Sequence, residues 1–299
     1  MTVVDVDGRT LKLSNLDKVL YPEVGFTKGQ VLDYYTRIAP VLLPHLRDRP
    51  LTLKRYPDGV DAGYFYEKQC PSHRPPWVET AAIWSGHNQR NIDFCLVNNL
   101  ATLVWVANLA SLELHTALHR APEINRPDSV VFDLDPGEGA GVAECAQVAL
   151  WLREALDHLR LANVVKSSGS KGLQLYVPLN TPVTYDATKS FALALAQVLE
   201  RAHPKAVVSN MAKDLRRNKV LIDWSQNDEH KTTVSLYSLR ARPRPTVSAP
   251  LHWEEVEGML SGADPSPGLI DAEATLDRVA RHGDLFAPLL TLKQTLPSF

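Results

Sequence analysis

Three aspartates at the ends of two apolar runs are the residues of this chain best suited to chemistry. Asp133 and Asp135 follow the run Val130-Val131-Phe132, and Asp223 follows Val220-Leu221-Ile222. Side chains alternate along a strand, so Asp133 and Asp135 point to one face, and Asp223 joins them if its strand lies alongside. Three neighbouring carboxylates repel one another, and divalent cations are the usual means of stabilising them. Because a pair of such ions serves phosphoryl and nucleotidyl transfer, we predict that Asp133, Asp135 and Asp223 are catalytic metal ligands.

A second candidate is the loop Ser167-Ser168-Gly169-Ser170-Lys171-Gly172, between the predicted strands 164–167 and 173–178. Small residues let backbone N–H groups approach an anion, and Ser168 and Lys171 add a donor and a charge. The spacing is not that of a Walker loop and no helix follows. A serine-rich hairpin turn without a ligand is therefore the alternative interpretation.

Polar residues also follow Asp223, in the order Trp224-Ser225-Gln226-Asn227, with Arg240 further along. Such side chains can hydrogen-bond the sugar or phosphates of a nucleotide, and an arginine can hold a phosphate with two parallel hydrogen bonds. Arg216 and Arg217 are either DNA contacts or ordinary loop charges.

Near the start of the chain, Asn15, Lys18 and Lys28 surround Tyr21-Pro22. Two lysines and an amide can hold a phosphate, but taken alone the pattern favours side chains that simply face water.

Aromatic residues are interleaved with basic ones in Lys54-Arg55-Tyr56 and Tyr64-Phe65-Tyr66. Nucleic-acid bases stack on aromatic rings with about 1–3 kcal/mol each, so this cluster can form a base-binding platform. For Phe65, packing into the core is an equal alternative.

The elements that position these residues follow from periodicity and capping. Thr27 and Gln30 have the spacing of a capping box at the start of a helix. Residues 99–115 are largely apolar and predict a buried helix, with a strand at its end. Further helices are expected over 142–161, 186–202 and 271–282, and strands over 51–55, 130–135, 164–167, 173–178, 220–224 and 232–236. Since no βα period repeats, the fold class is predicted to be α+β.

Composition limits the class of protein. The chain has 299 residues, 44% of them hydrophobic, and a net charge of −2. No run of about 18 apolar residues and no signal peptide occurs, so we expect a cytoplasmic protein that does not enter a membrane. Cys70, Cys95 and Cys145 form neither a disulfide framework nor a zinc pattern, which favours a reducing compartment.

The charges are segregated along the chain. Residues 200–245 contain ten basic and five acidic residues, whereas 246–299 contain three basic and eight acidic ones. A basic stretch around Asp223 suits a polyphosphate or nucleic acid. A solvated surface with scattered charges is the alternative.

Together, these motifs resemble the archaeo-eukaryotic primase superfamily, and most closely the polymerase domain of bacterial ligase D. The motifs that carry the resemblance lie at residues 15–22, 54–59, 67–69, 132–137, 168–173 and 223–227. The resemblance implies two α/β parts around a central cleft, with an RRM-like catalytic sheet. It also implies one ligase-D-type polymerase domain over 1–299, made of an N-terminal part (1–125), the catalytic sheet (126–245) and a helical extension (246–299).

The resemblance further implies roles for individual residues. Asp133, Asp135 and Asp223 would hold two divalent ions, Mn²⁺ or Mg²⁺. Phe65 and Tyr66 would stack on the incoming base and the template. The residues implied to bind the NTP or dNTP are Ser168, Lys171, Lys54, His115, Gln226 and Arg240. Asn15, Lys18 and Lys28 would hold the 5′-phosphate of a downstream DNA strand, which reverses the interpretation drawn from these residues alone.

Two features depart from the family pattern. The family usually has a histidine where this chain has Gln174, which puts nucleotide affinity or metal preference in question. No ligase or phosphoesterase segment accompanies the chain, so a stand-alone polymerase is expected, with a separate ligase and an end-binding protein as partners.

The leading hypothesis is a metal-dependent primer-extending nucleotidyltransferase that prefers ribonucleotides and acts on gapped or broken DNA. One alternative is a non-catalytic DNA-end-binding protein in which Gln174 marks a decayed site. A second is a haloacid-dehalogenase-type phosphatase, because its nucleophile strand resembles residues 130–135. The polar loops 85–91 and 210–218 are expected to touch DNA.

Overall fold

The computed structural model describes residues 1–260 and 266–297, which form two compact units. The first, called the N-terminal unit, comprises Met1–Glu123, Thr232–Val247 and Asp271–Gly283. The second comprises Ile124–Lys231, Ser248–Ile270 and Asp284–Phe299, and is called the acidic unit because it contains Asp133, Asp135 and Asp223. The chain therefore returns to both units near its end. Residues 261–265 and 298–299 of the expected helical extension lie outside the described residues.

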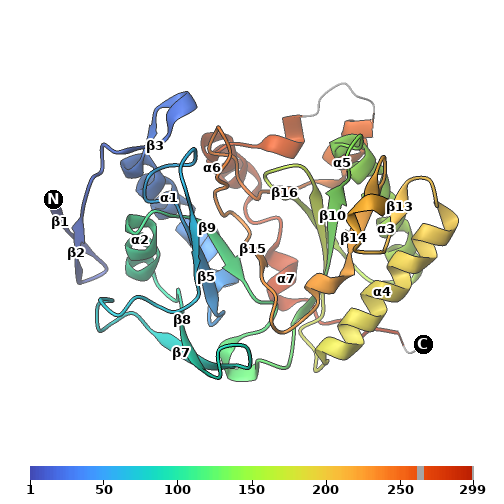
Figure 1. Ribbon diagram of the computed structural model, residues 1–299, viewed down its shortest axis with the longest axis horizontal. Helices are drawn as coiled ribbons and strands as arrows, with labels where there is room; N and C mark the ends of the chain where they lie inside the picture. The colour runs from blue at the N-terminus through green and yellow to red at the C-terminus, as the bar shows by residue number, and fades with distance from the viewer. Residues whose placement is uncertain (261–265, 298–299) are drawn as a thin grey trace. The chain divides into compact units, whose positions relative to one another are not determined.

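The acidic unit is built on a six-stranded sheet (Figure 1). Its strand order is β13 (Val207–Val208), β14 (Val220–Asp223), β10 (Ser129–Pro136), β12 (Leu173–Pro178), β11 (Val164–Ser167) and β16 (Pro250–Leu251). β10 is antiparallel to both of its neighbours, β12 and β14. The predicted strands at 130–135, 164–167, 173–178 and 220–224 are thus confirmed, the last ending at Asp223.

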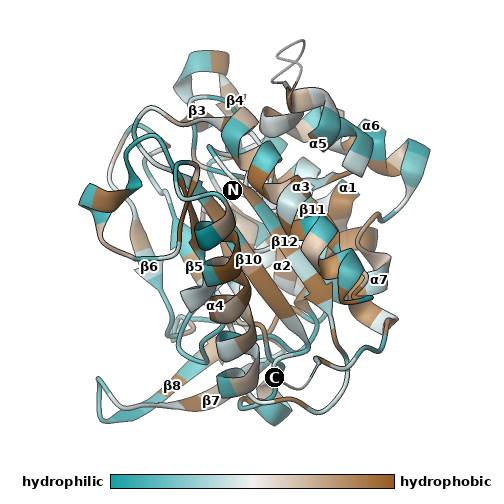
Figure 2. Ribbon diagram, turned by 90° about the vertical axis from the view of Figure 1, so that its right-hand side faces the viewer, coloured by the Kyte–Doolittle hydropathy of each residue, from teal (hydrophilic) through white to brown (hydrophobic). Residues whose placement is uncertain are grey.

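The two faces of β10 differ toward the end of the strand. Val130, Phe132 and Leu134 are fully buried. They face the helices α3 (Val142–His158) and α4 (Tyr185–Ala202), where the Phe132 ring packs 6.4 Å from that of Phe191. The strand is largely brown in Figure 2, as expected for a strand whose even-numbered residues enter a core. Alternation therefore places Asp133 and Asp135 on the other face.

The N-terminal unit contains a second sheet, with the order β15 (Thr233–Val234), β9 (Ser111–Thr116), β5 (Leu51–Arg55), β8 (Arg90–Cys95) and β7 (Thr80–Ser85); β6 (Phe65–Glu67) pairs with β5. Helix α1 (Lys28–Leu46) begins with the predicted Thr27–Gln30 capping box. Tyr34 and Tyr35 on α1 are buried, and their hydroxyls donate to the carbonyls of Tyr237 at 2.8 Å and Leu112 at 2.7 Å. These bonds tie the helix to the sheet and to the returning segment.

The remaining elements complete the two units. The predicted apolar segment 99–115 forms helix α2 (Leu100–Asn108) followed by strand β9, and the late helix α6 (Ala272–His282) ends at Gly283 as expected. The sequence patterns missed two short hairpins, β1 (Thr2–Val6) with β2 (Arg9–Leu13) and β3 (Val19–Tyr21) with β4 (Phe26–Thr27). They also missed the β7–β8 hairpin and the helices α5 (Trp253–Leu260) and α7 (Ala287–Thr291). No helix in the described ranges is long and apolar enough to cross a membrane.

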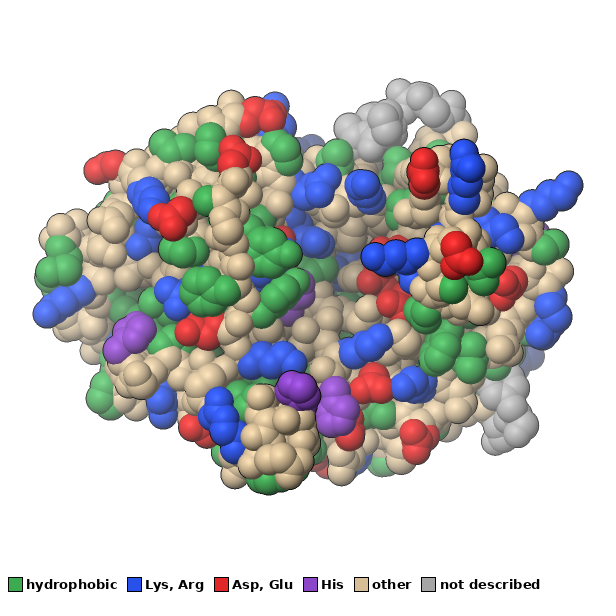
Figure 3. Space-filling view, in the orientation of Figure 1, with side chains coloured by type: hydrophobic (Ala, Val, Ile, Leu, Met, Phe, Trp, Pro, Cys, Tyr) green, Lys and Arg blue, Asp and Glu red, His purple; other side chains and the backbone are tan. Residues whose placement is uncertain are grey.

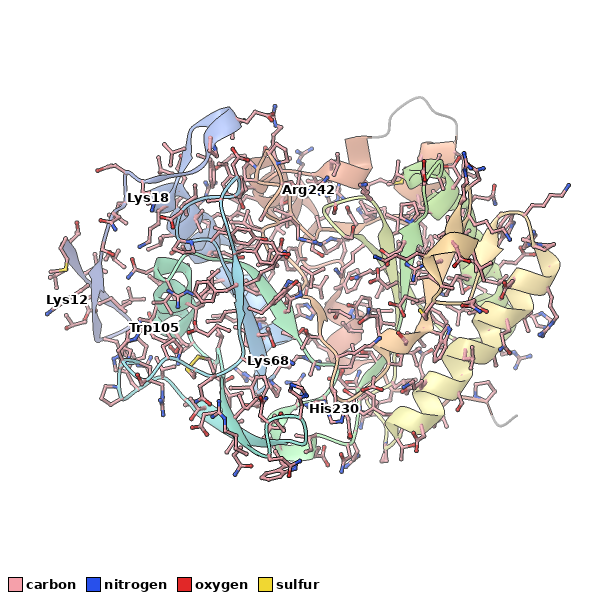
Figure 4. The ribbon with its side chains drawn as sticks, in the orientation of Figure 1. Lys12, Lys18, Lys68, Trp105, His230 and Arg242 are labelled. Atoms are coloured by element: carbon pink, nitrogen blue, oxygen red, sulfur yellow. A yellow bond between two sulfur atoms is a disulfide. The ribbon has the colours of Figure 1, made fainter. Side chains whose placement is uncertain are left out.

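The expectation that the cysteines form no disulfide was wrong. Cys70 and Cys95 are bonded to each other, and the yellow bond is visible in Figure 4, whereas Cys145 is free and buried. The two bonded residues are 25 positions apart, and the N–H of Cys70 donates to the carbonyl of Asp93 at 2.6 Å. The β7–β8 hairpin, which the sequence patterns missed, therefore brings Cys95 beside Cys70.

This pairing predicts a thiol count. Protein denatured without reductant should expose one reactive thiol, from Cys145, and three after reduction. Since a closed loop of about 25 residues stabilises a fold by roughly 2–4 kcal/mol, Cys95→Ser should lower the melting temperature measured under oxidising conditions. Cys145→Ser is the control for loss of a buried sulfur. Three thiols in the unreduced protein would show that the bond is absent in solution.

Candidate active site

The three predicted metal ligands lie on neighbouring strands. Asp133 on β10 is the direct register partner of Asp223 on β14, and Asp135 lies two residues further along β10. Asp223 is buried, Asp133 is partly buried and Asp135 is exposed. The three carboxylates do not yet surround one point: across residues 1–260 and 266–297, no three His, Cys, Asp or Glu side chains form a metal-binding group.

Burial and neighbouring charges both disfavour the ionised form of Asp133. Burial raises the pKa of Asp133, and the charges of Asp135 and Asp223 raise it further. A hydrogen bond from Gln174 and the charge of Lys166 act in the opposite direction but do not offset these effects. The carboxylate repulsion inferred from the sequence is thus present in the structure.

Asp223 is held by the turn that follows it. One carboxylate oxygen accepts from the N–H of Ser225 at 2.9 Å and from its hydroxyl at 2.6 Å. The other accepts from the amide of Gln226 at 2.8 Å. The predicted nucleotide-binding residue Gln226 therefore contacts the acidic cluster, and Lys231 contacts Ser225 in turn.

The loop between β11 and β12 lies at the ends of two site strands. The Ser168 hydroxyl accepts from the N–H groups of Ser170 at 3.3 Å and Gly172 at 3.2 Å, while the predicted phosphate-binding residue Lys171 is exposed. A Cβ on Gly172 would lie 2.0 Å from the carbonyl oxygen of Leu134. Only glycine allows this loop to approach β10 so closely.

The loops that follow β10 and precede β14 also pack together. A Cβ on Gly137 would lie 1.8 Å from the carbonyl oxygen of Arg216, and the N–H of Gly137 donates to the carbonyl of Lys219 at 2.8 Å. The guanidinium of Arg216 donates to the carbonyl of Met211, which makes this residue part of the loop's structure. Arg217 is exposed.

In the N-terminal unit, three of the predicted nucleotide-binding residues surround Glu113. This carboxylate lies 2.9 Å from His115, 3.5 Å from Lys54 and 3.5 Å from Arg240. Burial alone would raise the pKa of Glu113, but the His115 hydrogen bond and the three neighbouring groups hold it well below its usual range. Burial lowers the pKa values of His115 and Lys54. One buried anion thus orders a group of nitrogen donors.

The predicted stacking pair is divided between the two faces of β6. Tyr66 pairs with Lys54, and its ring lies 5.9 Å from that of His115. Phe65 pairs with Arg55, whose guanidinium lies 5.0 Å from the Phe65 ring. Both aromatic side chains are exposed, so Phe65 is not a core residue. Tyr64 lies on the Tyr66 side, with the Lys54 ammonium 4.2 Å from its ring centre.

Asn15, Lys18 and Lys28 come together at the start of α1. The N–H of Lys18 donates to the carbonyl of Asn15 at 3.0 Å, and the N–H of Lys28 donates to the carbonyl of Lys18 at 2.8 Å. Lys18, labelled in Figure 4, also pairs with exposed Asp58 at 2.7 Å. Lys28 is buried, and burial together with the charges of Lys18 and Arg55 lowers its pKa to about 8.

Two residues of these clusters, Glu113 and Lys166, were not predicted from the sequence. Glu113 stands two residues before His115, so strand alternation would have placed both on one face. Lys166 carried no signal, because a lysine in an apolar run is usually a solvent-facing residue; it is in fact fully buried.

One family of known proteins matches most of this chain. A family model described as "LigD, primase-polymerase domain" matches residues 27–286. The chain belongs to this family. Asn15 and Lys18 precede the matched segment. The phosphatase alternative has no support, since the strand on which it rested lies within the match.

Relatives and a solved structure agree with this assignment. The chain is 43% identical over 281 residues to the multifunctional non-homologous end joining protein LigD of Mycolicibacterium smegmatis, covering 93% of this chain and 36% of the relative. It is 30% identical to the bifunctional LigD of Bacillus subtilis, over 91% of this chain and 43% of the relative. The chain thus spans less than half the length of either relative.

The structure also matches the polymerase domain of Mycobacterium tuberculosis ligase D, solved in complex with DNA. The TM-score is 0.88 at 40% identity, over 95% of this chain and 99% of the other. The predicted α+β class and the archaeo-eukaryotic primase-like fold are therefore confirmed.

The raised pKa of Asp133 predicts a pH-dependent stability. Because the folded state favours the protonated carboxyl, this group's stabilising contribution is present at low pH and is lost as pH rises through the raised pKa. In the presence of a chelator, Asp133→Asn should be more stable than the wild type at pH 8, by on the order of 1–3 kcal/mol, and nearly equal to it at pH 4. Urea unfolding at both pH values measures this. Glu138→Gln, an exposed change on the following loop, should show no such difference, and an equal response of both variants would contradict the explanation.

Proposed function

We propose that the chain is a metal-dependent nucleotidyltransferase that extends a primer on gapped or broken DNA during end joining, with a preference for ribonucleotides. The observation that carries this proposal is the pairing of Asp133 with Asp223, with Asp135 beside them, in a member of the LigD primase-polymerase family. The matched solved structure is a polymerase domain in complex with DNA, which supports a DNA substrate for this chain.

The residues of the acidic cluster fit divalent cations. Their donors are carboxylate oxygens, which Mg²⁺ and Mn²⁺ accept. Burial, together with the charges of Asp135 and Asp223, raises the pKa of Asp133, and a bound cation would favour its ionised form. Asp133, Asp135 and Asp223 would hold the ions, which when bound supply Lewis-acid activation of the primer 3′-hydroxyl and charge neutralisation at the triphosphate.

Residues around the two clusters would bind the incoming nucleotide. In the acidic unit, exposed Lys171 and the N–H groups of the Ser168 loop offer donors to phosphates, and Gln226 keeps Asp223 in place. In the N-terminal unit, Lys54, His115 and Arg240 present nitrogen donors around Glu113. Exposed Tyr66 beside them offers a face for base stacking. Phe65, on the other side of β6, would contact a different base.

DNA contacts would come from separate regions. Asn15, Lys18 and Lys28 form a small cationic group suited to a terminal 5′-phosphate. Arg217 is available to a DNA backbone, whereas Arg216 shapes its loop. Figure 3 shows basic side chains intermixed with acidic ones, which favours local phosphate contacts. A ligase activity and an end-binding protein would complete repair.

A non-catalytic DNA-end binder is the second candidate. The specific observation in its favour is Gln174, a neutral amide where the family usually has a histidine, directly opposite Asp133. Extension activity separates the two candidates.

Primer extension on a gapped duplex with a downstream 5′-phosphate tests the proposal. We expect addition of nucleotides with Mn²⁺ or Mg²⁺, ribonucleotides being preferred, and a loss of at least about a hundredfold in Asp135→Ala because the metal ligand is removed. DNA binding, measured by fluorescence anisotropy, should be nearly unchanged in that variant. Binding without addition under every metal would favour the end binder, and near-normal extension by Asp135→Ala would exclude the acidic cluster as the catalytic site.

The lowered pKa of Lys28 predicts how 5′-phosphate recognition depends on pH. Lys28 loses its charge as pH rises through about 8, so the preference for 5′-phosphorylated over 5′-hydroxyl gapped DNA should fall between pH 7 and pH 9. Lys28→Gln should show a smaller preference at pH 7 and little dependence on pH. Lys12→Gln, an exposed change on β2, is the matched control. A preference that is independent of pH in the wild type would remove Lys28 from the phosphate site.

A further inference from the structure

Gln174, the register partner of Asp133 on β12, carries an unexplained polar atom beside the acidic cluster. Its side chain is only 3% exposed, and its amide donates a hydrogen bond to the Asp133 carboxylate. The other end of the amide, the Oε1 oxygen, has no hydrogen-bond partner. Buried carbonyl oxygens nearly always have a partner in native proteins, and an unpaired one indicates a missing water or ion.

The strand register shows what surrounds this oxygen. Asp223, Asp133, Gln174 and Lys166 are successive partners across β14, β10, β12 and β11, so their side chains form one row on one face of the sheet. Lys166 is the neighbour with donors to offer, but its ammonium contacts the Ser248 hydroxyl and leaves Oε1 unpaired. The free oxygen therefore lies in the row that holds two of the three carboxylates.

The donor set of the cluster is incomplete without this oxygen. In the described part of the chain, acidic, histidine and cysteine side chains alone do not form a three-ligand group. An amide oxygen is a hard donor of the kind that Mg²⁺ and Ca²⁺ accept. The terminal torsion of a glutamine is broad and nearly two-fold, so a half-turn exchanges its nitrogen and oxygen. That rotation would turn Oε1 toward an ion bound at Asp133.

We propose that Gln174 is an oxygen ligand of the divalent cation held by Asp133 and Asp223, and that it shifts the preference of the site toward Mg²⁺ relative to a histidine at this position. The inference rests on the proposed metal-dependent function. An imidazole nitrogen suits transition metals better than Mg²⁺, whereas an all-oxygen set accepts Mg²⁺ without this disadvantage. Glutamine in place of histidine at position 174 thereby changes which ion the site binds more tightly.

Metal binding to the whole chain, without nucleotide or DNA, tests this directly. The EPR signal of free Mn²⁺ reports binding, and competition with Mg²⁺ gives the affinity ratio of the two ions. Gln174→His should raise the ratio of Mn²⁺ to Mg²⁺ affinity by roughly fivefold or more, and Gln174→Met, which lacks the oxygen, should weaken both ions by about tenfold. Gln174→Asn keeps the amide but withdraws it by one methylene, and should weaken both ions even if the methionine variant is poorly folded.

Two controls separate the possible failures. Gln197→Met, the matched change at an exposed glutamine on α4, should leave the affinities for both ions as in the wild type. If Asp135→Ala abolishes binding while all Gln174 variants retain wild-type affinities for both ions, the metal site stands and the role of Gln174 is overturned. If the wild type binds neither ion, or Asp135→Ala binds both normally, the metal site of the proposed function fails, and the inference about Gln174 fails with it.

Discussion

The placement of three carboxylates on one face of a sheet is the constraint on which the acidic unit depends. Asp133 lies opposite Asp223 because β10 and β14 are antiparallel neighbours, and both strands are anchored by apolar residues on the reverse face. The packing of the reverse face thus fixes Asp133 and Asp223 as register partners, although burial and the neighbouring carboxylates disfavour the ionised form of Asp133. Ser225 and Gln226 stabilise the Asp223 carboxylate, and Gln174 and Lys166 partly stabilise that of Asp133. A bound cation would stabilise both carboxylates further.

The N-terminal unit uses the opposite arrangement. A single buried anion, Glu113, is surrounded by nitrogen donors from Lys54, His115 and Arg240. The carboxylate fixes their positions, and their combined positive character exceeds its charge. An acidic cluster suits metal ions and a donor cluster suits phosphates, and the proposed nucleotidyl transfer requires both kinds of group.

Tight backbone contacts keep the acidic cluster in shape. Gly172 approaches the backbone of Leu134, and Gly137 approaches that of Arg216, at distances that leave no room for a Cβ. Both glycines lie within a few residues of a site residue, either an aspartate or Gln174. Gly172, which belongs to the loop predicted to bind phosphate, thus also has a structural task, since it lets that loop pack directly on the strand that holds Asp133 and Asp135.

Local patterns along the chain were enough to predict the strand that ends in Asp133 and Asp135, the hairpin around Ser168, the Thr27 cap and the α+β class. Alternation, helical spacing and capping depend on residues within one element, so the chain displays them without reference to its fold. Other relations emerged only from the folded arrangement: Asp133 lies opposite Asp223, Phe65 and Tyr66 face apart, Glu113 organises the donor cluster, and Cys70 meets Cys95. These relations depend on which strands pair and in what register. That register is set by packing between residues distant along the chain, for which no local pattern exists.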